Sequence, residues 1–586
     1  MKYFLKKTTP SKKGIYYQIY QSAYIPGKGS RNKSYSQIGY HSDLLSQGIN
    51  DPEQYAKDLV KKLNDSLGTS VEKQIGEITT QKNVGYFLIK SIFDYLNIDK
   101  DINIVASSFH KKYNFSEFLR TMTYAQIYKP GSKKELFEKV TPTLFGCEKY
   151  SYDQILDGVN SLGSDCHKWI EVLNKQIKEK FDLDYSKGYF DCTNFYFEID
   201  QEDEYRKRGP SKENRSDPII GMALLLSNDV VPIDMNLYPG NESEKPQLRE
   251  RIEAVKETSE FEGKIIQVAD KGLNCARNIY AAVKEANDGY IFSKSIHGKN
   301  LTKIEKKWVL LEDDVANVWH TVKDANGKVL YKYKEWVTID EHKNLVNYDT
   351  QKYRCKLNPD DKKETEFEVT EKRIVTYNPS LAAKKRQEIK RMVEKLSGKL
   401  SANKILKNEL GELGKYVVSK TSNQEGEIVE IAYELNKEKI EEDLTYAGYN
   451  MLVTAEINVP AAEIYKIYHQ LWRIEHCFRT MKTYLEARPV YLQKEYSIYG
   501  HFLIVYFALT LLRLLELKVF KDEIPVEQII EFIRDYNVTE NYDGTFINNA
   551  SDTKTYRMIK EKYCLSKLGN VYLKKKDIEN ILDASF

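Results

Sequence analysis

The chain has 586 residues, of which 41% are apolar and 30% charged, with a formal net charge of +3. This composition excludes a disordered chain, because enough apolar side chains are present to bury large cores. The length corresponds to roughly four domains. A net charge near zero gives no support for a nucleic-acid partner. A nucleic-acid-binding site must therefore be sought in local clusters of basic residues.

Cysteine usage and the first residues indicate the compartment. The seven cysteines are scattered, and no pair has metal-ligand spacing, which excludes a structural zinc site of the usual kind. The N-terminus shows no secretory apolar segment. We therefore expect reduced thiols in a cytoplasmic protein, associated with the nucleoid when it is bound to DNA.

Residues 1–80 form a basic N-terminal region. The first 40 residues contain eight Lys or Arg, no Asp or Glu, and seven tyrosines. Alternation over Ile15–Tyr20 and the turn residues Pro26–Ser30 predict a β-hairpin, hence a β-rich DNA-binding region. A solvated basic tail is the alternative. The candidate phosphate contacts are Lys12, Lys13, Lys28, Arg31 and Lys33.

Residues 81–180 have a helical pattern, with amphipathic runs over 86–96 and 115–128. We assign them to a helical region that binds the DNA end, although a helical packing module would show the same pattern.

Strands alternate with helices between residues 181 and 298. Aromatic and β-branched residues predict a strand pair over Lys187–Ile199, with Asp191 in the middle of its first strand. A buried apolar run then ends at Asp270, as a strand would if it delivered an acid at its tip. Further strands are predicted over 219–226, 230–237 and 289–296, and helices over 245–258 and 274–286.

The segment 299–448 is predicted to be a β-rich insertion domain with one basic helix over 380–404. Its strands are expected over 307–311, 316–322, 329–338, 366–377 and 428–435. Trp308, Trp319 and Trp336 fall on these strands, where one of them could stack on a flipped base. Tryptophans on strands more often belong to a core.

Residues 449–520 contain a helix in which Tyr468, Glu475 and Lys482 recur at steps of seven. Seven residues are about two turns, so a continuous helix would place all three on one face. Arg479, four residues after Glu475, is expected on that face as a phosphate contact or as an ordinary ion-pair partner of Glu475. An amphipathic helix with a charged outer face would look similar.

The apolar run Phe502–Leu512 is shorter than the ~18 residues that a membrane-spanning helix requires, so we expect a core helix that covers the sheet and no membrane partner. A C-terminal helical region is predicted over 521–586.

An acid on the first strand, one after the fourth strand and one on a late helix is the layout of an RNase H-like fold. Together, the segments around Asp191, Asp270 and Glu475 resemble the DDE transposases of bacterial insertion sequences, in the branch with a Tyr-Arg-Glu-Lys helix signature (the IS-four-like superfamily). The segments 486–491 and 500–512 also look like that branch. The resemblance covers Tyr185 to Leu517 and departs at Leu471, where that branch has an arginine.

The resemblance implies an α/β protein: an RNase H-like core, a mixed sheet flanked by helices, in two parts (181–298 and 449–520). The core is interrupted by the β-rich insertion and preceded by the N-terminal hairpin and the helical DNA-binding regions.

Three acids in one site repel one another unless hard cations are bound, and oxygen ligands select Mg²⁺ or Mn²⁺. We expect Asp191, Asp270 and Glu475 to hold two such ions about 4 Å apart for cleavage of a phosphodiester. Tyr468 and Lys482 would then orient the phosphate.

By resemblance, the expected function is cut-and-paste transposition with a hairpin at the transposon end. The expected partners are double-stranded DNA, as terminal inverted repeats and target, and a second copy of the chain in a homodimer on that DNA. Two alternatives stay open: an end-binding protein without chemistry, and a stand-alone RNase H-like nuclease that cuts without joining.

Overall fold

A computed structural model describes residues 2–11, 14–25, 29–68, 81–213, 215–258, 261, 263–297, 301–310, 318–401, 411–421 and 431–586. The chain forms two compact units. The first consists of Met1–Thr80 with Glu540–Tyr542, and the second of Gln81–Thr539 with Asp543–Phe586.

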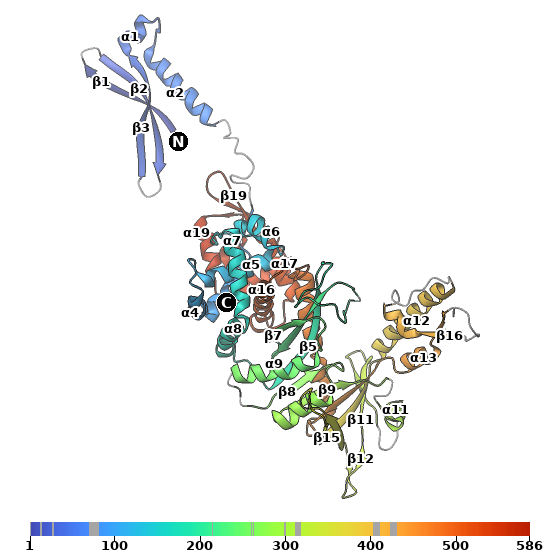
Figure 1. Cartoon of the computed structure of the whole chain (residues 1–586). Coiled ribbons are helices and arrows are strands. Elements are labelled where there is room, and N and C mark those ends of the chain that lie inside the picture. Colours follow the sequence, from blue (N-terminus) through green and yellow to red (C-terminus); the bar gives the residue numbers. More distant parts are fainter. Residues whose placement is uncertain are drawn as a thin grey trace. The chain divides into compact units, whose positions relative to one another are not determined.

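The first unit is a three-stranded antiparallel sheet with two helices (Figure 1). Its elements are β1 (Lys2–Ser11), β2 (Gly14–Ile25), β3 (Gly29–Tyr40), α1 (His41–Ser46) and α2 (Pro52–Gly68). The β2–β3 hairpin confirms the predicted hairpin, and β1 adds a strand to it. Tyr17, Leu44 and Ala56 are buried and form its small core.

The candidate phosphate contacts of this unit are only partly described. Lys12, Lys13 and Lys28 lie outside the described residues. The backbone of Arg31 pairs with Ala23 across β3 and β2, and the side chain of Lys33 in β3 is exposed.

The second unit is built on a ten-stranded mixed sheet whose main path runs β10-β11-β15-β18-β9-β8-β5-β6-β7. The strands at its β7 end are β5 (Lys187–Tyr196), β6 (Ile219–Leu226), β7 (Pro232–Pro239), β8 (Ile266–Ala269) and β9 (Gly289–Lys294). β5, β6 and β7 are mutually antiparallel, whereas β8 pairs parallel with β5 and β9 parallel with β8. Three antiparallel strands followed by two parallel ones are the RNase H-like core that was predicted.

Helices cover both faces of this core. Gly188 in β5 faces α9 (Lys245–Thr258), since a Cβ added there would lie 3.2 Å from Cδ1 of Ile252. The odd-numbered residues of β5 lie on the opposite face and pack toward α16 (Glu495–Leu514), since the rings of Phe195 and Phe502 lie 4.7 Å apart. Side chains alternate along a strand, so Asp191 and Thr193 share the face of Phe195. Cover on both faces explains why every residue of β6 is buried.

The inserted segment extends the core sheet. β18 (Tyr449–Thr454) pairs with β9, β15 (Thr365–Tyr377) pairs with β18, and β11 (Val329–Glu335) pairs with β15. Four further strands lie before β15 in this segment: β10 (His320–Lys323), β12 (Thr338–Ile339), β13 (Leu345–Val346) and β14 (Asp349–Cys355). The strands predicted over 316–322, 329–338 and 366–377 are therefore present with shifted ends.

The strand predicted over 307–311 is wrong, because Lys303–Leu310 form helix α11. Thr302 Oγ1 accepts a hydrogen bond from the Glu305 amide at 3.2 Å, and the Glu305 side chain accepts one from the Thr302 amide at 2.7 Å. This reciprocal pair is a capping box, which begins a helix.

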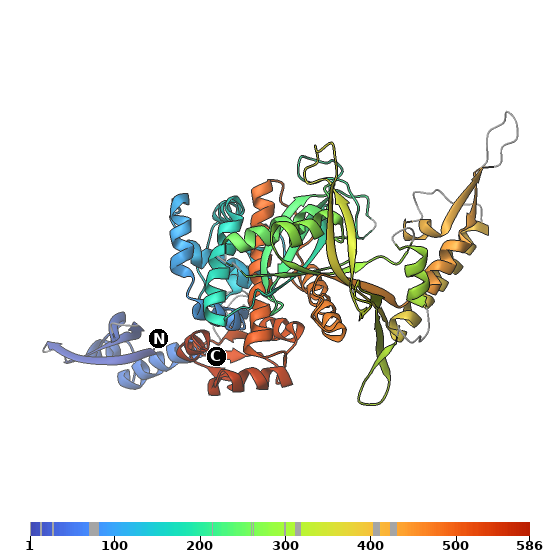
Figure 2. The same cartoon turned by 90° about the horizontal axis from the view of Figure 1, so that it is seen from below.

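The basic segment predicted over 380–404 is helix α12 (Pro379–Ser401). It lies with α13 (Lys437–Thr445), β16 (Val417–Thr421) and β17 (Ile431–Leu435), in the yellow and orange part of the ribbon (Figure 2). Ile389, Leu396 and Tyr416 form a small buried core there.

A helical layer packs around α16, which is buried along most of its length. α3 (Phe87–Leu96) and α5 (Phe115–Tyr128) coincide with the two predicted amphipathic runs. The other helices here are α4 (Asp99–Ala106), α7 (Tyr152–Ser164), α8 (Cys166–Phe181) and α17 (Val526–Asp535). α16 contains the predicted apolar core helix, and within the described residues no helix is both long and apolar enough to cross a membrane.

The C-terminal region is not wholly helical, which corrects the prediction for 521–586. α17, α18 (Lys554–Lys562) and α19 (Lys575–Leu582) alternate with three short strands that continue a sheet from β4 (Gln81–Asn83). These strands are β19 (Asn537–Glu540), β20 (Phe546–Asn548) and β21 (Tyr572–Leu573).

Candidate active site

The register of the parallel strands brings two of the predicted acids together. Phe190 in β5 pairs with Ala269 in β8, so Asp191, the next residue of β5, lies beside Asp270, which directly follows β8. Asp191 Oδ1 accepts a hydrogen bond from the Cys192 amide at 2.8 Å. Burial, helped by the charges of Glu244 and Asp270, raises the pKa of Asp191 to about 6, although Lys212 and the hydrogen bond from the Cys192 amide lower it.

Tyr468 reaches the same place from a late helix. Its hydroxyl donates a hydrogen bond to Asp270 Oδ1 at 3.1 Å. Burial and the charge of Asp270 raise the pKa of Tyr468, so the phenol stays protonated as a donor at neutral pH.

The predicted single helix is broken between Tyr468 and Glu475. α14 (Ala461–His469) ends, α15 (Trp472–Arg479) begins after two residues, and a π-helix, η7 (Thr480–Tyr484), follows. At the break the amides of Gln470 and Leu471 bond to carbonyls three residues back, which tightens the turn. Seven-residue spacing therefore does not by itself align Tyr468, Glu475 and Lys482 on one helix face.

Glu475 nevertheless responds to the charge of Asp270. Partial loss of hydration and the negative charge of Asp270 raise the pKa of Glu475, while Lys212 lowers it. Asp270 thus acts electrostatically on Asp191 of β5 and on Glu475 of α15, as a member of a shared site does.

Lys212 belongs to this site and was not anticipated. It lies in the loop between β5 and β6, with Nζ 3.7 Å from Asp191 Oδ1 and 3.4 Å from Glu244 Oε1. The ammonium also donates to the Cys192 carbonyl. Burial favours the neutral amine, but Asp191 and Glu244 together raise the pKa of Lys212, so it remains a cation.

Lys482 lies beside the acids on the same face of β5. Its Nζ donates to Thr193 Oγ1 at 2.9 Å and lies 3.2 Å from Glu213 Oε1. Glu213 also accepts from Arg488 Nη1. Glu213 and Arg488, like Lys212, could not be singled out from the sequence, because their partners are far away along the chain.

The two arginines of the late helix have other partners. Arg479 is exposed, and its Nη2 lies 3.6 Å from Glu527 Oε1, whereas the pKa of Glu475 responds to Asp270 and Lys212. Arg473 pairs with Asp522, with Nη1 3.2 Å from Oδ1, and lies over the ring of Trp472. Leu471, where the resembled branch has an arginine, is buried in the core.

The three tryptophans of the inserted segment gather around two cations. Trp308 is buried on α11, not on a strand as predicted, and meets Trp336 edge to face with ring centres 5.0 Å apart. Lys334 Nζ lies 4.6 Å from the Trp319 ring centre, and Arg373 lies over Trp336. Trp319 and Trp336 are half-buried and lie just outside β10 and β11.

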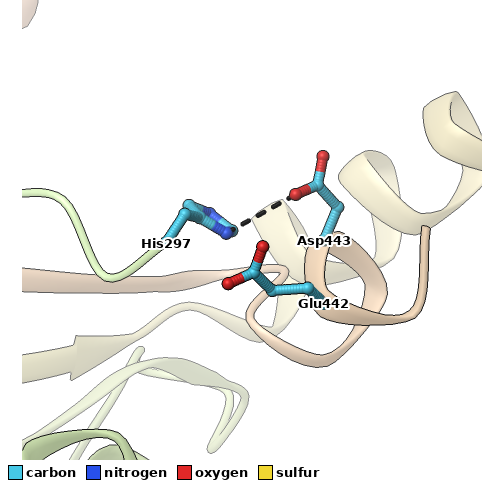
Figure 3. Close-up of side chains that lie close together, drawn as sticks. All are labelled: His297, Glu442 and Asp443. Atoms are coloured by element: carbon cyan, nitrogen blue, oxygen red, sulfur yellow. Dashed lines mark ion pairs between the residues drawn. The ribbon is translucent and has the colours of Figure 1, made fainter. Parts of the chain in front are cut away.

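Within the described residues, one group of acids and histidines brings three ligand atoms within 4.8 Å of one another: His297, Glu442 and Asp443 (Figure 3). Asp191, Asp270 and Glu475 do not all bring a ligand atom within this limit of one another. Lysines already offset both carboxylates of the group, since Lys439 Nζ lies 2.8 Å from Glu442 and 2.9 Å from Asp443. This group is therefore an ion-pair cluster that joins α13 to its neighbours.

The stretch of chain that contains these residues matches a known protein family. The family described as "Transposase DDE domain" matches residues 190–511, more than half of the chain and the whole stretch from Asp191 to Lys482. The chain belongs to the DDE transposase family. Among solved structures, a cryo-EM structure of the piggyBac transposase synaptic complex with hairpin DNA is similar over 85% of this chain and 84% of that one, with a TM-score of 0.33 and 8% identity. No curated protein matches the chain.

Membership of the DDE transposase family implies dependence on a divalent metal ion. The residues present fit such an ion, because the three acids offer only oxygen ligands, the donors that Mg²⁺ and Mn²⁺ prefer. A positive charge is already accommodated at this place, where the Lys212 ammonium lies 3.7 Å from Asp191.

Proposed function

We propose that this DDE transposase cleaves DNA at the ends of a transposon and joins the released ends to target DNA. One observation carries the proposal: the parallel register of β5 and β8 sets Asp191 beside Asp270, and Tyr468, from a late segment, donates a hydrogen bond to Asp270. The charge of Asp270 also raises the pKa of Glu475 in α15. Acids contributed by three distant segments, with a cation and a phenol beside them, suit phosphodiester chemistry.

Asp191, Asp270 and Glu475 would hold the metal, most simply two Mg²⁺ or Mn²⁺ ions. When bound, the ions would lower the pKa of an attacking hydroxyl and stabilise the leaving oxygen. Tyr468 holds its proton toward Asp270 and orients that carboxylate. Lys482, fixed by Thr193, offers a positive charge to the phosphate.

The finer assignments rest on the resemblance. We propose membership of the Tyr-Arg-Glu-Lys branch, a hairpin at the transposon end, and a homodimer on the DNA. The basic N-terminal region 1–80 and the helical region 81–180 would hold the terminal repeats.

The test is to incubate the protein with DNA carrying the repeats that flank its own gene and a target plasmid, with and without Mg²⁺. Nicked, hairpin and joined products separate on denaturing gels. Asp191→Asn, Asp270→Asn and Glu475→Gln should each abolish cleavage and retain DNA binding, since each removes a ligand charge and little volume.

Asp229→Asn is the matched control, because Asp229 pairs with Lys518 at 2.7 Å and belongs to a turn after β6. Cleavage by Asp270→Asn at the wild-type rate would contradict the site. Cleavage without joining would favour a nuclease, and binding without cleavage by the wild type would favour an end-binding protein.

A further inference from the structure

Two adjacent residues of the β5–β6 loop carry opposite charges into the active site. Lys212 places its ammonium between Asp191 and Glu244, at 3.7 and 3.4 Å. Glu213 places its carboxylate between Lys482 and Arg488. Lys212 thus supplies a cation to the acids, and the adjacent Glu213 supplies an anion to the basic residues.

The carboxylate of Glu213 is bound through both oxygens, as a phosphate group would be. One oxygen, Oε1, lies 3.2 Å from Lys482 Nζ, and the other, Oε2, accepts from Arg488 Nη1. A phosphodiester presents two free oxygens in a similar way, and a lysine with an arginine is a common pair for binding them.

The two cations are held in place before any ligand arrives. Lys482 Nζ also donates to Thr193 Oγ1, and Thr193 is two residues from Asp191 on the same face of β5. Two residues of a strand span roughly 7 Å. The anion site therefore lies within one nucleotide of the acids.

Two buried groups hold the backbone just before Arg488. Gln126 Nε2 donates to the Leu485 carbonyl at 2.7 Å, and His501 Nε2 lies 3.1 Å from the Ala487 carbonyl oxygen. Its guanidinium lies 5.0 Å from the ring centre of Tyr196 in β5. An arginine built in this way is pre-organised for a ligand on the sheet face.

We propose that Lys482 and Arg488 form a binding site for one DNA phosphate, and that Glu213 occupies this site until DNA displaces it. The inference rests on the proposed function and names the phosphodiester contact of that same active site.

The experiment measures binding of a fluorescent duplex carrying the flanking repeat, in EDTA, by anisotropy over a range of salt concentrations. Glu213→Gln removes the competing anion and should tighten binding about threefold to fivefold. Arg488→Gln should weaken binding and flatten the log-log salt slope by about 0.9, the value for one phosphate contact. Arg488→Lys, which keeps the positive charge, should retain most of the affinity and most of the salt slope of the wild type.

Glu204→Gln is the matched control, because Glu204 is an exposed glutamate of the same loop and its change alters the net charge equally. In the Arg488→Gln background, Glu213→Gln should bring no gain. Equal tightening by Glu204→Gln and Glu213→Gln would overturn the inference, because only net charge would then matter.

Cleavage in Mg²⁺ reports separately on the proposed function. Wild-type cleavage together with unchanged binding by Glu213→Gln overturns the phosphate site alone. Failure of every variant and of the wild type to bind the duplex overturns both proposals.

Discussion

Gly500→Ala should strongly destabilise the second unit. Gly500 lies where α16 crosses α7, and a Cβ added there would lie 1.8 Å from the Val159 carbonyl oxygen. Gly163, the reciprocal residue on α7, would bring its own Cβ to 1.7 Å from the Tyr496 carbonyl oxygen. Both neighbours are backbone atoms, so no side-chain rotation can relieve either contact.

The magnitude follows from the required movement. Ordinary contact with a Cβ begins at 3.4 Å, so the helices must separate by roughly 1.6 Å. Overpacking costs about 1–3 kcal/mol, and a backbone clash belongs at the upper end of that range. About 3 kcal/mol corresponds to a fall in the melting temperature of roughly 6 °C for a large domain.

Differential scanning fluorimetry checks this value against Gly398→Ala. Gly398 lies in α12, where an added Cβ meets no heavy atom within 4 Å. Alanine in that helix should leave stability unchanged or raise it by up to about 1 kcal/mol. If Gly500→Ala melted within a degree of the wild type, the close crossing of α7 and α16 would be refuted.

Three further predictions concern charge. The pKa of Asp191 is raised from 3.8 to about 6, so the folded chain binds the extra proton and loses stability as pH rises through 6. In EDTA at pH 7.5, Asp191→Asn should therefore be more stable than the wild type by up to about 3 kcal/mol. An equal difference in unfolding free energy between the two proteins at pH 4 would contradict this. Burial lowers the pKa of Lys133 to about 7, so above pH 7 the unfolded chain binds more protons than the folded chain. The free-energy cost of burying Lys133 therefore falls as pH rises. Lys133→Met should raise the melting temperature at pH 7 and less so at pH 9, and a constant difference would refute the cause. Deleting residues 1–80 should weaken DNA binding and flatten its salt slope by about 0.9 for each phosphate that this unit binds, whereas an unchanged slope would show that the unit does not touch DNA.

The local pattern of residues determined the strands and helices of the core. The all-apolar β6 and the amphipathic runs of α3 and α5 show the periodicities that distinguish buried strands from helices, and those periods depend only on neighbours in the chain. The acids of the site could be named for the same reason, since Asp191 and Asp270 each sit on or directly after such a strand.

One error could have been avoided from the sequence. Thr302 and Glu305 have the spacing of a capping box, which marks the start of α11. The β-branched and aromatic residues that follow, Val309 and Trp308, favoured a strand, and the cap outweighs their propensity.

Only the tertiary structure decided which charged side chains lie together in the site. The tightened turn at Leu471, a buried side chain, sets where Tyr468 and Glu475 point. Lys212 and Glu213 reach the site through a long loop, and Arg488 is aimed by buried groups of α5 and α16. Strand register and helix crossing position these groups. Both depend on packing between residues far apart in the chain, which hydrophobic periodicity along the chain does not encode.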